Sequence, residues 1–367
     1  MKKNKMKRII ILVLVITILA ILGVFVYTKF LKDKIFKNLG NEVVTEEQNN
    51  SPIVVEKKTV QIFKGNDRPI AVMIDNHKAA LPQAGLNKAY MIYEIIVEGG
   101  ESRIMALFKG ADLEKIGPIR SSRHYFLDYA LENDAIYVHY GWSPQAQSDI
   151  KSLGVNNING ITQSSKDFWR VKDKSSPHNA VTSTSNILKM AESKDYRTTS
   201  NVSSVLKYVV DEVNLENGVK ADTITIPYSY SNNVKWMYKE DTKTYQRYSK
   251  NIKQVDWDTK EEFTAKNIII EFIANSTLDD GENKGRQTMT TTGTKDGYYI
   301  TNGKAIKITC TKNSRSSKTV YKDLDGKEIE VNDGNTFVQI CPINADVKIE
   351  ANEVKNEETS NTSKEAK

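Results

Sequence analysis

A run of twenty uncharged, mostly apolar residues at positions 9–28 most constrains this chain, because a helix of that length spans a bilayer's hydrocarbon core. Five Lys and Arg residues lie within residues 1–8, and Lys29 follows the run. This pattern predicts a cytoplasmic tip (1–8) and a transmembrane anchor (9–28), with the C-terminal bulk outside a plasma membrane. A cleaved signal peptide is the alternative, but the long run and the missing A-x-A-like site favour a single-pass anchor.

The positive charge of the chain is concentrated at its start. The formal net charge is +6, and five positive charges with no acidic residue fall within the first 28 positions. The remainder is therefore close to neutral, which removes the main electrostatic support for nucleic-acid binding. The chain is 39% hydrophobic, as expected of a folded protein rather than a disordered one.

Composition divides the rest of the chain into four segments. We expect a polar stalk (29–66), a first folded block (67–215), a β-rich second block (220–350) and a disordered tail (351–367). In the first block, apolar runs at 69–74, 91–97, 104–108 and 135–139 predict strands. Ser121 could cap one helix. Ser143, Pro144 and Gly154 mark the start and end of another.

The overall prediction is a mixed α+β protein: a layered α/β N-terminal domain, then a β-rich C-terminal domain, preceded by one transmembrane helix. In the second block, Asn302-Gly303 and Asp325-Gly326 lie between β-rich runs and predict hairpins. Cys310 and Cys341 both fall on predicted strands. A disulfide and two buried thiols both fit the sequence, and we favour unpaired thiols.

All four histidines, His77, His124, His139 and His178, fall in the first block. His77 and His139 end predicted strands, so they could converge where ligands bind in open α/β sheets. Gly141 and the helix start at Ser143 would add unpaired N–H groups that attract anions. Alternatively, these are ordinary turn and cap residues.

Arginines are the second signal of a binding site in this block, at Arg103, Arg120, Arg123 and Arg170. Guanidinium groups match carboxylates and phosphates in geometry, which points to an anionic ligand. The same arginines could instead pair internally with acidic residues, and the sequence leaves both interpretations open. The candidate partners are Asp75, Glu94, Glu98 and Asp128.

Catalytic templates fit poorly. The residues at 141–145 open like a nucleophile elbow but lack its closing glycine. A triad can be drawn from Ser143, His178 and Asp75, as it can in nearly any chain. No H-E-x-x-H, phosphate-binding loop or C-x-x-C motif is present, so we expect no metal site and no cofactor.

Several ordered motifs together resemble the YerB-like family. In the first block they are RPIAVMIDNH (68–77), PQAGL (82–86), EGG (98–100) with Arg103, IGPIRS (116–121) with Tyr125-Phe126, YVH (137–139) with Gly141 and Ser143-Pro144, FWR (168–170) and PHN (177–179). In the second block they are GRQ (285–287), GYY (297–299) with TNG (301–303), and SRSS (314–317).

This resemblance covers about 67–345 and implies a bacterial envelope protein with two α+β domains and no established activity. Members of the family are lipoproteins, whereas this chain has no cysteine just after its apolar run, where a lipid would be attached. We therefore expect a membrane-anchored extracytoplasmic protein that binds an anionic small molecule, a cell-wall fragment or an envelope partner. The expected ligand-binding residues are Arg103, Arg120, Arg123, His139, Ser143, Arg170, His178 and Asn179. The alternative is an envelope hydrolase or transferase in which His139 or His178 is the general acid or base.

Overall fold

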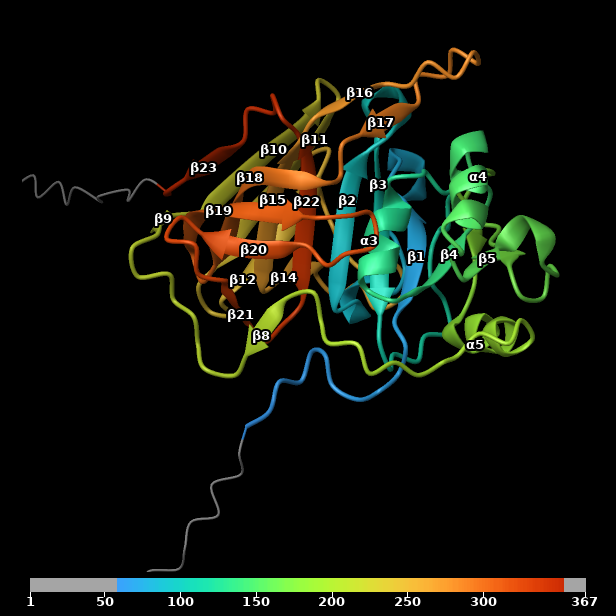
Figure 1. Cartoon of the computed structure of the whole chain (residues 1–367), viewed down its shortest axis with the longest axis horizontal. Helices are drawn as coiled ribbons and strands as arrows, with labels where there is room; N and C mark the ends of the chain where they lie inside the picture. The colour runs from blue at the N-terminus through green and yellow to red at the C-terminus, as the bar shows by residue number, and fades with distance from the viewer. Residues whose placement is uncertain (1–57, 353–367) are drawn as a thin grey trace, which may run out of the picture. The chain divides into compact units, whose positions relative to one another are not determined.

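The centre of the fold is an eleven-stranded mixed sheet to which both blocks of the sequence contribute strands (Figure 1). The structure is a computed structural model and describes residues 58–352. The expected tip, anchor, most of the stalk and most of the tail lie outside these residues. In spatial order the strands are β20 (Val320–Asp323), β19 (Lys304–Lys312), β18 (Gly293–Thr301), β15 (Asn267–Ile273), β22 (Thr336–Pro342), β2 (Met91–Ile96), β3 (Ser102–Phe108), β1 (Ile70–Asp75), β4 (Ile136–His139) and β5 (Asn157–Asn159), with β9 (Val219–Lys220) also paired to β19.

One strand joins the two blocks. The late strand β22 lies between β15 and β2 and runs parallel to both. Its Phe337 is opposite Ile268 on one side and Ile92 on the other. The red β22 and the cyan β2 accordingly lie side by side in Figure 1. A single sheet thus continues from the first block into the second.

A second sheet of six strands comes from the later block. Its strands are β13 (Ile252–Lys253), β12 (Thr244–Ser249), β11 (Asn232–Lys239), β10 (Thr223–Ser229) and β23 (Lys348–Glu350), with β14 (Thr264–Ala265) paired to β12. Three two-stranded sheets pair β16 (Asn275–Thr277) with β17 (Gln287–Met289), β8 (Lys207–Val209) with β21 (Glu330–Asn332), and β6 (Trp169–Arg170) with β7 (Ala180–Val181). The α-helices described are α3 (Phe126–Glu132), α4 (Pro144–Ser152) and α5 (Thr184–Glu192).

The central sheet is buried on both faces. Because side chains alternate along a strand, Val72 and Ile74 of β1 belong to one core, with Ile187 of α5 and Trp236 of the second sheet. Met73 belongs to the other core, with residues of α3, β8 and β21. The second sheet and α5 therefore cover one face, and α3 with the small β8–β21 sheet covers the other. Burial on both faces explains why β1 reads as a continuous apolar run.

Several local predictions are confirmed. The expected strands of the first block correspond to β1, β2, β3 and β4. Ser143 caps α4, accepting a hydrogen bond from the Ala146 N–H, and Pro144 is its first residue. Asn302 and Gly303 have φ angles of 49° and 75°, as a type I′ turn requires, and join β18 to β19. Cys310 and Cys341 are buried and unpaired.

One local prediction is wrong, and another holds only over a short stretch. Ser121 does not cap a helix, because the segment around it is extended: Ile119 bridges Ile74 and Ser122 bridges Trp142. The helix begins only at Phe126. The Asp325-Gly326 segment does form a short hairpin, because the Asp323 N–H donates to Lys327 O, the Ile329 N–H donates to Tyr321 O, and Lys322 bridges Glu328. The hairpin does not extend further, since the following strand β21 pairs with β8.

Candidate functional site

The carboxyl end of β1 carries Asp75, which organises a small cleft. Backbone hydrogen bonds hold the neighbouring segment in place: the Asp75 N–H donates to Pro118 O (2.8 Å) and the Arg120 N–H donates to Met73 O (2.9 Å). Asp75 also lies opposite Arg103 in the β1–β3 register. The cleft is about 180 Å³ and is lined by Asp75, His77, Val97, Glu98, Glu101, Ser102, Arg103, Arg120 and His178. We call it the Asp75 cleft.

The Asp75 carboxylate is shared by three donors. Oδ1 accepts from the His77 backbone N–H at 3.0 Å. Oδ2 lies 2.7 Å from His178 Nδ1 and 3.2 Å from Arg120 Nε. Asp75 is only 3% exposed, so these contacts replace the water that a charged carboxylate would otherwise bind.

A second carboxylate, Glu98, is shared by two arginines. Arg123 donates to its Oε1, and Arg103 Nη2 lies 3.6 Å from its Oε2. Burial works to raise the pKa of Glu98, but the hydrogen bond and charge of Arg123 and the charge of Arg103 lower it overall. Glu98 is therefore held as an anion between two guanidinium groups.

Positive charge exceeds negative charge among the arginine pairs in and beside the cleft. Three guanidinium groups share two carboxylates, because Glu101 is occupied separately by Lys250. Burial and the nearby positive charges of Arg123 and Arg120 lower the pKa of Arg103 to about 10. The negative charge of Glu98 opposes this shift only in part. An additional anion beside Arg103 would relieve this repulsion.

Two stacked imidazoles form one wall of the cleft. The His77 and His178 rings lie 4.4 Å apart with 13° between their planes. His77 Nδ1 accepts from the Ala79 N–H, which leaves the ring proton of neutral His77 on Nε2. A neutral His178 ring has the opposite arrangement, because its Nδ1 donates to Asp75 and its Nε2 is then an acceptor. The pair thus offers one donor and one acceptor.

Arg170 and Asn179 shape the loop that carries His178. Arg170 Nη1 donates to Asn179 Oδ1 at 2.6 Å, and its guanidinium lies 5.2 Å from the centre of the Tyr140 ring. The Asn179 amide donates to Val171 O (3.0 Å) and Lys174 O (3.1 Å). Both residues thus hold the loop, whereas Arg103, Arg120 and His178 line the cleft itself.

His139 and Ser143 lie outside the Asp75 cleft. His139 is fully buried, with Nδ1 2.8 Å from Gly141 O and Nε2 3.2 Å from Asn157 Oδ1. Burial lowers the pKa of His139 to about 4. Both its nitrogens have protein partners, Gly141 and Asn157, and the possible convergence of His139 with His77 is not found. Ser143 caps α4 and is 3% exposed, so its hydroxyl is used structurally.

Sequence reasoning missed the buried layer behind the cleft. There Arg247 of β12 pairs with Glu94 of β2, which also accepts hydrogen bonds from Asn76 and Ser102. Arg247 lies on the same face of β12 as Tyr245 and Ser249, and all three side chains are buried. The sequence did contain a signal for this pair: Arg247 occupies a position whose strand neighbours on the same face point into the core, and a buried charge there needs a buried partner. Residues 58–352 contain no group of three or more metal-ligating side chains.

Comparison with known proteins establishes the family. Residues 57–197 match the N-terminal domain of a family described as protein of unknown function (DUF3048). Residues 224–338 match the C-terminal domain of the same family. The chain belongs to the DUF3048 family. The putative lipoprotein YerB of Bacillus subtilis is 30% identical over 285 residues, which cover 75% of this chain and 81% of that protein. This confirms the resemblance seen in the sequence motifs.

A solved structure supports the fold. The crystal structure of YerB from Bacillus subtilis matches with a TM-score of 0.70 at 28% identity, covering 80% of this chain and 97% of that one. The mixed, sheet-rich fold with few helices and its two-domain layout agree with that structure. The family description gives no activity.

These findings correct the expected location. The relative is named a putative lipoprotein, a class held at membranes by acyl chains rather than by a spanning helix. No helix within residues 58–352 is long and apolar enough to cross a membrane. The apolar run at 9–28 lies outside those residues. The comparison contradicts the prediction of a single-pass plasma-membrane protein, and we do not retain it.

Proposed function

We propose that this chain is an extracytoplasmic binding protein whose Asp75 cleft holds an anionic group of a small molecule or cell-wall fragment. The extracytoplasmic location is drawn from the name of the relative, a putative lipoprotein. The observation that carries the binding proposal is an excess of guanidinium groups in and beside the cleft: Arg103 and Arg120 line it, and Arg123 lies beside it on Glu98. Three arginines share Asp75 and Glu98, and the pKa of Arg103 is lowered to about 10 by burial and by its cationic neighbours.

The groups that face the cleft suit an oxyanion. Arg120 keeps 25% of its side chain exposed and uses Nε for Asp75, so its terminal nitrogens can donate to a ligand. His77 Nε2–H would add a neutral donor beside them. His178 is fixed by Asp75, so its ring needs little reorganisation when a ligand arrives.

Isothermal titration of the purified protein with inorganic phosphate and with soluble peptidoglycan fragments tests this proposal. We expect binding that weakens at least tenfold, about 1.4 kcal/mol, in Arg120→Gln. Arg197→Gln is the matched control, since Arg197 also pairs with an aspartate, Asp134, but does not line the cleft. Failure of the wild type to bind any of these anions, or equal weakening by both variants, would exclude the Asp75 cleft as an anion site.

The Asp75–His178 contact supports a second candidate, a hydrolase or transferase with His178 as general base. A carboxylate that binds Nδ1–H leaves Nε2 free to take a proton from water or a hydroxyl group. The nearby Ser102 is a poor nucleophile, because its hydroxyl donates to Glu94 at 2.7 Å. His139 is a poor base, because both its nitrogens are engaged.

Product analysis separates the two candidates. If the protein converts a bound fragment and His178→Gln abolishes conversion while binding persists, the cleft is catalytic. If every fragment is recovered unchanged after long incubation, binding remains as the function.

A further inference from the structure

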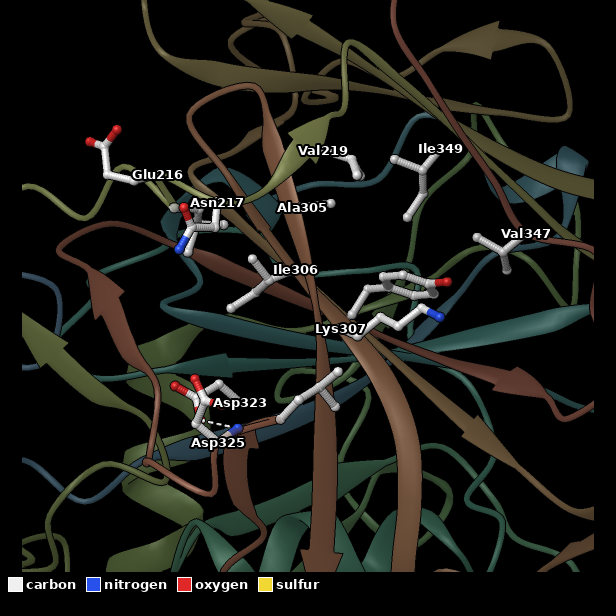
Figure 2. A pocket seen from close by; sticks show the side chains of 13 residues that line it. Glu216, Asn217, Val219, Ala305, Ile306, Lys307, Asp323, Asp325, Val347 and Ile349 are labelled. Carbon is white, nitrogen blue, oxygen red and sulfur yellow. Dashed lines mark hydrogen bonds between the residues drawn. The ribbon is translucent and has the colours of Figure 1, made fainter.

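A groove unrelated to the Asp75 cleft opens at the edge of the main sheet. Its volume is about 730 Å³, and it lies between β9, β19 and β20, with residues of β18 and β23 at its far side. Figure 2 shows Ile306 and Lys307 of β19 at its centre. Ligand sites typically occupy about 300–1,000 Å³, so the groove is large enough for a short peptide segment or a small molecule.

The centre of the groove is a gap in strand pairing. Along this edge, β19 pairs with β9 at Lys304 and Ala305, and with β20 from Ile308 onward. Ile306 and Lys307 have no strand partner there within the described chain. The two-residue Asn302-Gly303 turn closes on a hydrogen-bonded pair, and such pairs alternate along the ladder. The backbone N–H and C=O of Lys307 therefore point away from β18, toward the groove.

The walls of the groove differ in character. On one side lie Val219, Val347 and Ile349, and on the other lie Glu216, Asp323 and Asp325 (Figure 2). Val219 is 62% exposed and Leu324, beside the two aspartates, is 69% exposed. Large apolar side chains exposed together at one concave place are typical of a binding surface.

The acidic side is largely uncompensated. Glu216 is 84% exposed and its only cation within the described residues is Lys304, at 4.0 Å. No Lys, Arg or His of residues 58–352 forms an ion pair with Asp325. Asp323 uses Oδ1 for the backbone N–H groups of Asp325 and Lys327. The lining thus holds three carboxylates against the one ammonium group of Lys307, and this side complements a positively charged occupant.

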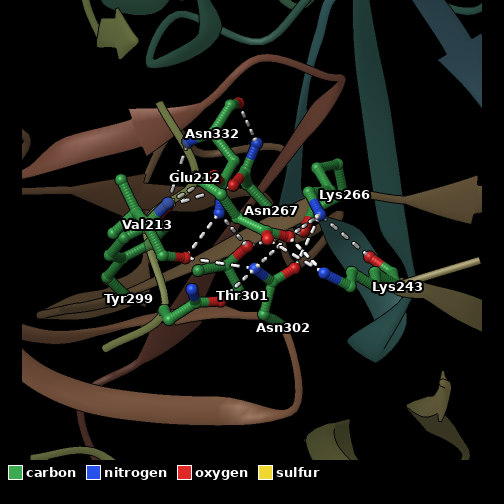
Figure 3. A network of polar contacts seen from close by, with 10 residues as sticks. Glu212, Val213, Lys243, Lys266, Asn267, Tyr299, Thr301, Asn302 and Asn332 are labelled. Carbon is green, nitrogen blue, oxygen red and sulfur yellow. Dashed lines mark hydrogen bonds and ion pairs between the residues drawn. The ribbon is translucent and has the colours of Figure 1, made fainter. Parts of the chain in front are cut away.

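The groove is held open by a polar network beside it (Figure 3). The Asn302 amide donates to Glu212, to Val213 O and to Asn214. Asn332 accepts from the Val213 N–H at 2.8 Å and donates to Val213 O at 2.8 Å. These bonds fix residues 212–214, and β9 fixes Val219, so the wall at 215–218 is anchored at both ends. A preformed groove costs little ordering on binding.

We propose that this groove binds an extended segment of a partner polypeptide carrying alternating apolar residues and a basic side chain. The N–H and C=O of Lys307, in the gap between β9 and β20, can form one pair of backbone hydrogen bonds with the segment, and the apolar wall contacts its side chains. Glu216, Asp323 and Asp325 attract the basic group. An anionic lipid surface is disfavoured by the same carboxylates.

Titration of the isotopically labelled full chain with the peptide acetyl-Val-Thr-Val-Lys-Val-amide, followed by NMR, tests this site directly. We expect chemical-shift changes confined to β19, β9 and the 323–325 turn. We expect at least tenfold weaker binding in Leu324→Ser and in Asp325→Lys, both on an exposed turn that should keep the fold. Tyr230→Ser is the matched control, because Tyr230 is fully exposed and does not line the groove. The same peptide with Glu in place of Lys should bind at least tenfold more weakly.

Several results would overturn the proposal. They are the absence of shifts at millimolar peptide, equal binding of the Lys and Glu peptides, and binding that neither groove variant changes. Binding of decylammonium without binding of the peptide would assign the groove to a small amphiphile instead. Self-association that Leu324→Ser abolishes would assign it to a second copy of the chain.

Discussion

Glu94 and Arg247 form an ion pair of 2.8 Å in which neither side chain is exposed to solvent. The pair links β2 in the central sheet to β12 in the second sheet, and so joins the two blocks of the sequence. Glu94 Oε1 also accepts from Asn76 and Ser102, and Oε2 from Gln339. The network lies directly behind the Asp75 cleft, since Ser102 lines that cleft.

Breaking this pair on one side should strongly destabilise the protein. In Glu94→Gln the Arg247 charge stays buried without a counterion, and we expect a loss of about 3–5 kcal/mol in the free energy of unfolding. The double variant Glu94→Gln/Arg247→Met should recover a large part of it, because no buried charge is then left. Urea denaturation measures both. A cost below about 1 kcal/mol for Glu94→Gln would show that water reaches the pair.

His139 should make stability depend on pH. Burial lowers its pKa to about 4, from about 6.5 in the unfolded chain, so the unfolded state binds more protons between these values. The stabilisation is complete above pH 6.5 and is lost as the pH falls toward 4. We expect the free energy of unfolding to fall by about 1 kcal/mol per pH unit from this residue.

The comparison with His139→Gln isolates that contribution, because all carboxylates remain common to both proteins. The stability difference between wild type and variant should shrink as the pH falls from 7 to 4.5. A difference independent of pH would show that His139 titrates normally in the folded protein.

Two glycines with similar backbone angles should respond differently to alanine. Gly303 (φ +75°) has Tyr238 Cε1 2.8 Å from the position of an added Cβ, whereas Gly326 (φ +83°) has nothing within 4 Å. Gly326→Ala should cost about 1 kcal/mol from the left-handed backbone alone. Gly303→Ala should cost about 2–4 kcal/mol, because the Tyr238 ring must also move. Thermal unfolding of the two variants gives the comparison, and equal costs would contradict it.

The thiols should react only when the protein unfolds. Burial raises the pKa of Cys310 and of Cys341, and both side chains are fully enclosed. Reaction with Ellman's reagent at pH 8 should therefore follow the global unfolding rate and accelerate in urea. Immediate labelling of either thiol in the native protein would show local opening of β19 or β22.

The sequence correctly predicted those strands, caps and turns that depend only on residues close together in the chain. The strand at β1, the cap of α4 at Ser143 and the turn at Asn302-Gly303 depend on a few neighbouring residues, and the structure has them. The prediction that Ser121 caps a helix was wrong because the preference of serine for a helix start is weak compared with the strand-like bridges that Ile119 and Ser122 form. The motifs also identified the family correctly.

Long-range partners could not be predicted in the same way. The pairing of β2 with β22 joins residues about 245 positions apart, and nothing in either apolar run specifies the other. For the arginines the sequence left ligand binding and internal pairing open. The structure shows carboxylate partners for Arg103, Arg120 and Arg123, and an excess of cations beside them. Ligand binding at the cleft stays a prediction.

The position of β22 has a consequence for how the chain is made. Until residue 342 has left the ribosome, β2 has one bare edge and β15 lacks its parallel neighbour. A nascent chain must therefore keep two apolar strand edges from pairing with other molecules until β22 has been made. β22 is the last strand of the central sheet to be made and lies in its middle, so truncation before β22 should prevent both halves of the sheet from folding, not only one.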